Sequence, residues 1–155
     1  MKMKIIYCGQ FEDSSGYGVA ARGYLKALDS FINSESVDIE LKVHPIVFET
    51  ENKNSDDENQ LVDKYRLEKS EEFLESPYIV VWHLPAPSLV VHQQRHLEKW
   101  PLTQKIINNA SRIINLAAWE TDGVPVEWLK VYKDYNFDSV IVPSKWNHDV
   151  FARSI

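Results

Sequence analysis

Glycine and serine gather in one stretch of the chain, residues 8–25, which reads CGQFEDSSGYGVAARGYL and starts at the end of an apolar run. Gly16 and Gly18 form a G-x-G-x-x-A pattern with Ala21, a pattern typical of phosphate-binding loops that precede a helix. The N-terminus of a helix presents free amide groups and the positive end of the helix dipole, which suits an anion. The amides of Gly16, Tyr17 and Gly18 are therefore candidate phosphate ligands. The alternative is a loop that needs glycine only for its backbone conformation, and the pattern alone does not separate the two.

The spacing of this loop argues against the common nucleotide-binding motifs. In a dinucleotide fingerprint the first glycine directly follows the first strand, whereas Gly16 lies eight residues beyond Cys8. The acidic residue that binds the ribose should end the second strand about 20 residues further on, but Glu49 stands about thirty residues from Gly18. The chain also lacks the G-x-x-x-x-G-K-[ST] pattern. We therefore expect no NAD, FAD or other bound cofactor and no P-loop.

A second polar stretch, residues 119–128, reads WETDGVPVEW and also follows an apolar run. It places Glu120 and Asp122 just beyond a predicted strand. A carboxylate is costly to bury without a partner, so each of these side chains either faces water or binds a hydroxyl group or a cation. The simpler alternatives are that Asp122 caps the following turn and that Glu120 is only exposed.

Three further polar residues come at the ends of apolar runs. His83 closes PYIVVWHL ahead of a proline-rich turn. It is a candidate contact for an acceptor or a phosphate, although a hydrogen bond to a loop carbonyl is the simpler explanation. Ser144 and Lys145 follow DSVIVP and begin a predicted helix, whose N-terminus favours an anion. A capping role for Ser144 is the simpler explanation there.

Apolar runs alternate with helix-like segments along the chain. Strands are predicted at residues 4–8, 37–48, 77–84, 112–119 and 138–142, helices at 18–32, 61–74, 125–135 and from 144 onward, and the stretch 88–100 is ambiguous. This order predicts a single α/β domain with a Rossmann-like, doubly wound, mostly parallel sheet and helices on both faces. Ligands of such sheets bind beyond the carboxyl ends of the strands, where the glycine loop, His83 and Glu120 should meet.

Two of these elements carry side-chain predictions. The strand at 37–48 alternates between apolar and polar residues, which predicts a half-exposed strand near a sheet edge with His44 on the polar side. The helix at 18–32 is amphipathic, and its apolar side includes Tyr24 and Phe31.

Composition narrows the function classes. The chain has 155 residues and a net charge of −6, which argues against nucleic-acid binding because phosphate contacts need a basic face. No stretch approaches the ~20 apolar residues of a membrane span, and no secretory signal opens the chain, so we expect a cytoplasmic protein without a transmembrane segment. Residues 49–60 predict a mobile loop, in which Asp56, Asp57 and Glu58 form a solvated charge run and no metal site.

Two segments carry a resemblance to a known family. They read YCGQFEDSSGYGVAARGYLKAL and AAWETDGVPVEWLKVYKDYNFDSVIVPSKWNHDVF, and they contain W-E-T, P-x-x-W, D-x-V-x-V-P-S and N-x-x-V-F patterns. Over nearly its whole length the chain resembles the N-terminal domain of GT-B-fold glycosyltransferases of glycosyltransferase family 4. The second segment is fairly specific, whereas the glycine loop alone is not.

The resemblance implies an enzyme of two Rossmann-like domains that face each other across a cleft. Residues 1–155 would be the N-terminal, acceptor-side domain, and the C-terminal nucleotide-sugar-binding domain would be missing. The enzyme would be a retaining glycosyltransferase that moves a sugar from a nucleotide-diphosphate sugar to an acceptor hydroxyl of a carbohydrate, without a metal. The chain alone would then be inactive, and an exposed docking surface would favour a homodimer. The alternative is a non-catalytic Rossmann-like module that binds a small phosphorylated or sugar ligand, or a protein.

The resemblance also suggests roles for the candidate residues. Glu120 would be catalytic, at a position where many relatives carry a histidine. Gly16, Tyr17 and Gly18 would bind the donor diphosphate. The acceptor or substrate contacts would be His83, Asp122, Ser144 and Lys145.

Overall fold

An apolar strand, β1 (Met3–Gly9), runs through the interior of the fold. The structure is a computed structural model that describes residues 2–35, 37–48, 56–67, 71–95 and 97–154. Its strands form one parallel sheet in the order β2-β1-β3-β4-β5. The other strands are β2 (Ile39–Pro45), β3 (Ile79–His83), β4 (Arg112–Leu116) and β5 (Ser139–Ile141). As predicted, β2 lies at an edge of the sheet.

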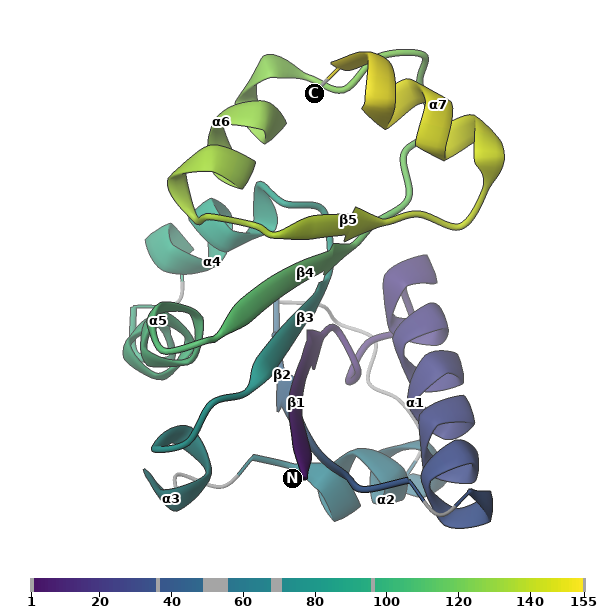
Figure 1. The fold of residues 1–155 in the computed structure, drawn as a ribbon, viewed down its shortest axis with the longest axis vertical. Helices are drawn as coiled ribbons and strands as arrows, with labels where there is room; N and C mark the ends of the chain where they lie inside the picture. The colour runs from purple at the N-terminus through teal and green to yellow at the C-terminus, as the bar shows by residue number, and fades with distance from the viewer. Residues whose placement is uncertain (1, 36, 49–55, 68–70, 96, 155) are drawn as a thin grey trace.

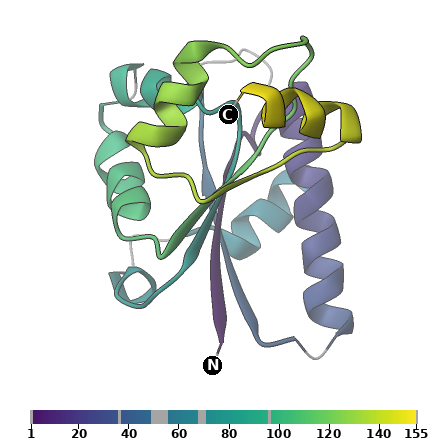
Figure 2. The same cartoon turned by 45° about the horizontal axis from the view of Figure 1, so that its top comes forward.

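Helices lie on both faces of this sheet (Figure 1). They are α1 (Gly16–Ser34), α2 (Asp56–Tyr65), α3 (Glu71–Leu74), α4 (Ser88–Arg95), α5 (Trp100–Asn108), α6 (Val126–Asp134) and α7 (Lys145–Ser154). Figure 2 shows α1 and α2 on one side of the sheet and α3, α4 and α5 on the other. Apolar side chains of α6 and α7 pack together in one cluster next to β5. The predicted Rossmann-like α/β fold is therefore confirmed.

Strand β3 shows how the sequence builds these layers. Val80 and Trp82 are fully buried in the cluster that faces α3, α4 and α5, while Val81 packs on the opposite cluster with α1 and α2. Every residue of β3 before His83 is apolar, as a strand covered on both faces requires. No helix in the described part of the chain is long and apolar enough to cross a membrane.

Several predictions about the elements were wrong in detail. His44, predicted on the polar side of β2, is 7% exposed, because α4 and α5 cover that face as well. Tyr24 and Phe31, predicted on the buried side of α1, are both 46% exposed. The buried stripe of α1 is narrower than the apolar pattern suggested, and it contains Ala21 and Leu25.

The boundaries between 49 and 108 also differ from the prediction. The predicted loop at 49–60 lies partly outside the described residues, and from Asp56 onward the chain is already helical in α2. The helix predicted at 61–74 is divided into α2 and α3. The ambiguous stretch at 88–100 belongs to two helices, α4 and the beginning of α5.

Candidate functional site

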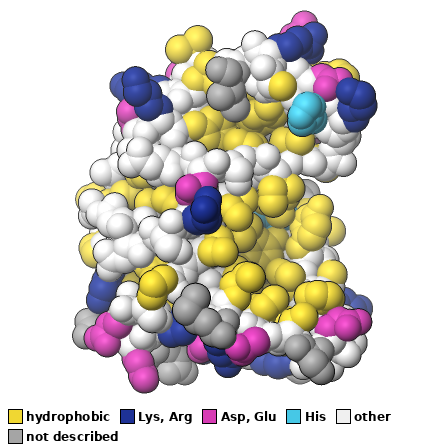
Figure 3. Space-filling view, viewed as in Figure 1, with side chains coloured by type: hydrophobic (Ala, Val, Ile, Leu, Met, Phe, Trp, Pro, Cys, Tyr) yellow, Lys and Arg dark blue, Asp and Glu magenta, His cyan; other side chains and the backbone are white. Residues whose placement is uncertain are grey.

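A cavity of about 350 Å³ opens at the carboxyl ends of β1, β3 and β4. Its lining residues come from the glycine loop, from α1, from the last residues of β3 and β4 and from the segments that follow β4 and β5: Gln10, Ser15, Gly16, Tyr17, Ala20, Tyr24, His83, Leu116, Ala117, Ala118, Glu120 and Pro143. Four predicted site residues, Gly16, Tyr17, His83 and Glu120, therefore meet in one place. Figure 3 shows apolar side chains gathered beside α1 on this face of the molecule.

The glycine loop is held rigidly as it enters α1. Asp13 is 5% exposed, and its Oδ1 accepts hydrogen bonds from the Ser15 amide at 2.9 Å and the Ser15 hydroxyl at 2.5 Å. From the next turn of the helix, Arg22 donates to the Phe11 and Asp13 carbonyls at 3.1 and 2.6 Å. These bonds fix the backbone immediately before the first helical amides.

The two glycines of this loop have different roles. Ser15 caps α1, since its hydroxyl accepts the Gly18 amide at 3.1 Å. Gly18 is buried with its Cα against Asp13, and its amide is paired with the Ser15 cap, so its role as a phosphate ligand stays a prediction that the observed hydrogen bond does not favour. Gly16 faces open space. The amides of Gly16 and Tyr17 are the first two of the helix, and no other described residue accepts a hydrogen bond from them.

Tyr17 joins the start of α1 to the segment after β4. Its hydroxyl donates to the Ala118 carbonyl at 3.1 Å and lies 3.3 Å from the Ala118 amide nitrogen. Burial raises the pKa of Tyr17, the bond to Ala118 lowers it, and the nearby Glu120 carboxylate raises it again. This contact brings Glu120 beside the N-terminus of α1.

The segment that carries Glu120 is held from its other side as well. Asn147, in the first turn of α7, is 7% exposed and accepts the Trp119 amide at 2.8 Å. The Trp119 indole donates to the Gly123 carbonyl at 2.8 Å and packs on Trp128. Glu120 itself is exposed on the rim of the cavity, where its carboxylate can accept hydrogen bonds from hydroxyl groups.

His83 closes the floor of the cavity. It is 5% exposed at the end of β3, opposite Gly9 of β1. Its Nδ1 lies 2.6 Å from the Tyr7 hydroxyl, so its partner is a side chain and not the predicted loop carbonyl. Burial lowers the pKa of His83 to about 4, which leaves the ring neutral at pH 7.

The other three candidate residues do not line the cavity. Asp122 is exposed two residues beyond Glu120. Ser144 caps α7 by accepting the Asn147 amide at 3.1 Å. Lys145 points its ammonium group at Asp149, 2.9 Å away. The structure therefore assigns capping and surface ion-pairing contacts to Ser144 and Lys145.

The sequence analysis assigned no site role to Gln10 and Tyr24, which line the cavity, or to Tyr7, which lies behind His83. Tyr24 follows Tyr17 by seven residues, which places both on one side of α1. That spacing could have indicated that Tyr24 lies beside Tyr17 at the site. The hydrogen bond between Tyr7 and His83 joins residues 76 positions apart, and no local pattern indicates it.

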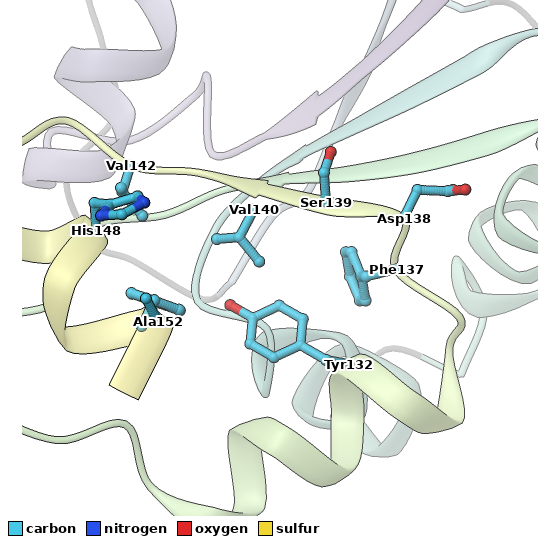
Figure 4. A pocket seen from close by; sticks show the side chains of 9 residues that line it. Tyr132, Phe137, Asp138, Ser139, Val140, Val142, His148 and Ala152 are labelled. Atoms are coloured by element: carbon cyan, nitrogen blue, oxygen red, sulfur yellow. The ribbon is translucent and has the colours of Figure 1, made fainter. Parts of the chain in front are cut away.

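A second hollow of about 380 Å³ lies between β5, α6 and α7. Figure 4 shows Tyr132, Phe137, Val140, His148 and Ala152 around it. None of the predicted site residues is among its described lining, so the candidate site remains the first cavity. Within the described ranges, no group of three or more His, Cys, Asp or Glu side chains is placed to hold a metal ion.

Comparisons of the chain with protein-family models, with curated proteins and with solved structures found no match. The resemblance to glycosyltransferases therefore stays a prediction, and a function must be argued from the cavity.

Proposed function

We propose that this chain is the acceptor-side domain of a retaining glycosyltransferase, and that its cavity receives the reacting end of a nucleotide-diphosphate sugar together with an acceptor hydroxyl. One observation carries the proposal: two helix amides without a hydrogen-bond partner among the described residues, a buried histidine and an exposed carboxylate surround a single cavity at the carboxyl ends of the strands. This edge is where ligands of doubly wound sheets bind.

The cavity lining offers two kinds of chemistry. The amides of Gly16 and Tyr17, together with the helix dipole, suit the diphosphate, whose negative charge grows as the bond to the sugar breaks. The Glu120 carboxylate suits sugar hydroxyls or the positive charge that develops on the sugar ring. The rings of Tyr17 and Tyr24 add apolar surface to the lining, as a sugar ring requires.

The described lining of the cavity carries no cationic side chain that could bind a diphosphate, which agrees with a site completed by a second domain. No lysine or arginine is among the described lining residues, so the anion would be held by amides and by His83 alone. Backbone amides at one helix end give weaker attraction than a paired cation. We therefore expect millimolar affinity and no turnover by this chain alone, with the remaining phosphate contacts supplied by a partner domain.

Binding measured by NMR tests the proposal, with UDP-glucose, GDP-mannose and inorganic pyrophosphate as ligands. Glu120→Gln should weaken both nucleotide sugars more than pyrophosphate, because the carboxylate is assigned to the sugar end. Asp122→Asn is the matched control, since it removes an equal charge two residues away but outside the cavity lining. Equal effects of the two variants would contradict the role given to Glu120, and rapid sugar transfer by the 155-residue chain would contradict the half-enzyme proposal.

A further inference from the structure

The ring of His83 is in contact with a buried tyrosine, Tyr7. The Tyr7 hydroxyl lies 2.6 Å from His83 Nδ1, and the two rings are stacked with their centroids 5.8 Å apart. Tyr7 is 2% exposed, and burial raises the pKa of its phenol, which therefore keeps its proton. Within the described part of the chain, His83 is the only hydrogen-bond partner of this hydroxyl.

Two proton arrangements agree with this contact. In the first, Tyr7 donates to a bare Nδ1, and the neutral histidine carries its proton on Nε2. In the second, Nδ1 donates to the phenol oxygen, and the phenolic proton is left in the interior without an acceptor. A buried donor without a partner is strongly unfavourable, so the first arrangement should dominate by about tenfold or more.

The Nε2 atom is the ring nitrogen of His83 that Tyr7 does not contact. It has no hydrogen-bond partner among the described residues. It is also not among their fully buried polar atoms that lack a partner, so it is accessible from the cavity. The ring lines the cavity, and the edges of Tyr17 and Tyr24 hold it at centroid distances of 5.7 and 5.5 Å. A neutral imidazole with its proton on Nε2 presents a donor at that surface.

We propose that Tyr7 is a positioning residue that locks His83 in the form protonated on Nε2, so that His83 donates a hydrogen bond to an oxygen atom of the ligand and does not act as a base. The ligand group at this point of the cavity is then a hydrogen-bond acceptor, and a phosphoryl oxygen suits it best because a charged acceptor makes the stronger bond. The choice of a phosphorylated ligand rests on the proposed function. The lock rests only on the contact between Tyr7 and His83.

Nitrogen-15 NMR of the full chain at pH 7 shows which ring nitrogen of His83 carries the proton, because bare and protonated ring nitrogens have very different chemical shifts. We expect the signal of a protonated nitrogen at Nε2 and of a bare one at Nδ1. Tyr7→Phe removes only the phenol oxygen and should move both signals of His83 toward the average of the two forms. Tyr78→Phe is the matched control, because Tyr78 is equally buried and its hydroxyl donates to the Ile106 carbonyl on the other face of the sheet.

The spectrum of the unaltered chain tests the proton position on His83 even if a variant fails to fold. A proton on Nδ1 of His83 in the unaltered chain overturns the lock. Unchanged His83 signals in folded Tyr7→Phe overturn it as well. Glu120, Tyr17 and Tyr24 also line the cavity, so the spectra should be followed from pH 5 to pH 8 to confirm that the His83 ring stays neutral.

Inorganic pyrophosphate tests the donated hydrogen bond separately. It should shift the Nε2 proton of His83 together with the amides of Gly16 and Tyr17. His83→Gln retains an N–H group near the position of Nε2 and should bind pyrophosphate nearly as well as the unaltered chain, whereas His83→Leu should lose about tenfold. Shifts of the amides without a shift of Nε2 overturn the donor role. If pyrophosphate moves none of these signals, the proposed function fails, while the nitrogen shifts still decide the lock.

Discussion

Gly18 offers a sharp test of how the glycine loop is built. A Cβ at this position would overlap the Asp13 carbonyl oxygen and would lie 2.5 Å from Asp13 Oδ1 and 2.8 Å from the Gln10 carbonyl oxygen. Two of these atoms belong to the backbone, and Arg22 ties the Asp13 carbonyl down with a bond of 2.6 Å. The loop therefore cannot move aside cheaply. We expect Gly18→Ala to lower the free energy of unfolding by about 3 kcal/mol, at the upper end of the cost of overpacking.

Gly23→Ala is the matched control on the same helix. Apart from the neighbouring backbone of α1, no atom lies within 4 Å of a Cβ at Gly23, so alanine there should raise the free energy of unfolding by about 1 kcal/mol through its better helix propensity. Urea unfolding followed by far-ultraviolet circular dichroism measures both variants. The opposite signs are the essential result. If Gly18→Ala is as stable as the unaltered chain, the tight contact between Gly18 and Asp13 is refuted.

Three further predictions follow from the hydrogen bonds and buried histidines. Ser15→Ala should lower the free energy of unfolding by about 1 kcal/mol in urea titrations, because α1 loses its cap; no change would contradict that role. Asn115→Leu should cost about 3–5 kcal/mol in the same assay, since it removes a buried hydrogen bond from each of two backbone carbonyls and from the Tyr132 hydroxyl, and a loss below 1 kcal/mol would speak against this network. The pKa values of His44 and His83 are lowered to about 4, chiefly by burial, whereas an unfolded histidine titrates near 6.5. The unfolded chain therefore binds more protons between these two pH values. The free energy of unfolding should fall as the pH drops from about 6.5 to about 4, by at most about 3 kcal/mol for each histidine. A free energy of unfolding that stays constant across this pH range in urea titrations would refute the burial of neutral rings.

The sequence was a good guide to the sheet and a poorer guide to the helices between residues 49 and 108. The strands β1, β3 and β4 are short, mainly apolar runs between polar segments, and burial on both faces leaves few other choices, as in β3. Strand β2 instead alternates between apolar and polar residues, which is typical of a strand near a sheet edge. The acidic segment at Asp56 looked like a loop, yet acidic residues are also favoured at the start of a helix, where α2 places them. Pro101 lies in the first turn of α5, a position where proline is common, so it could have indicated where this helix begins.

The candidate site was predictable in position but not in detail. Parallel strands bring their carboxyl ends to one edge, so the approach of His83 and Glu120 to the glycine loop follows from topology alone. The different roles of Gly16 and Gly18 depend on a contact with Asp13, and a G-x-G pattern carries no information about such contacts. The bond between Tyr17 and Ala118 spans 101 positions and is equally invisible in the sequence.

A crystal structure of the chain soaked with UDP-glucose at high concentration tests the central claim most directly. The proposed function predicts phosphate oxygens within hydrogen-bond distance of the Gly16 and Tyr17 amides and of His83 Nε2, with the sugar toward Glu120. A nucleotide sugar bound instead in the hollow between β5, α6 and α7, with the first cavity holding only water, would contradict it.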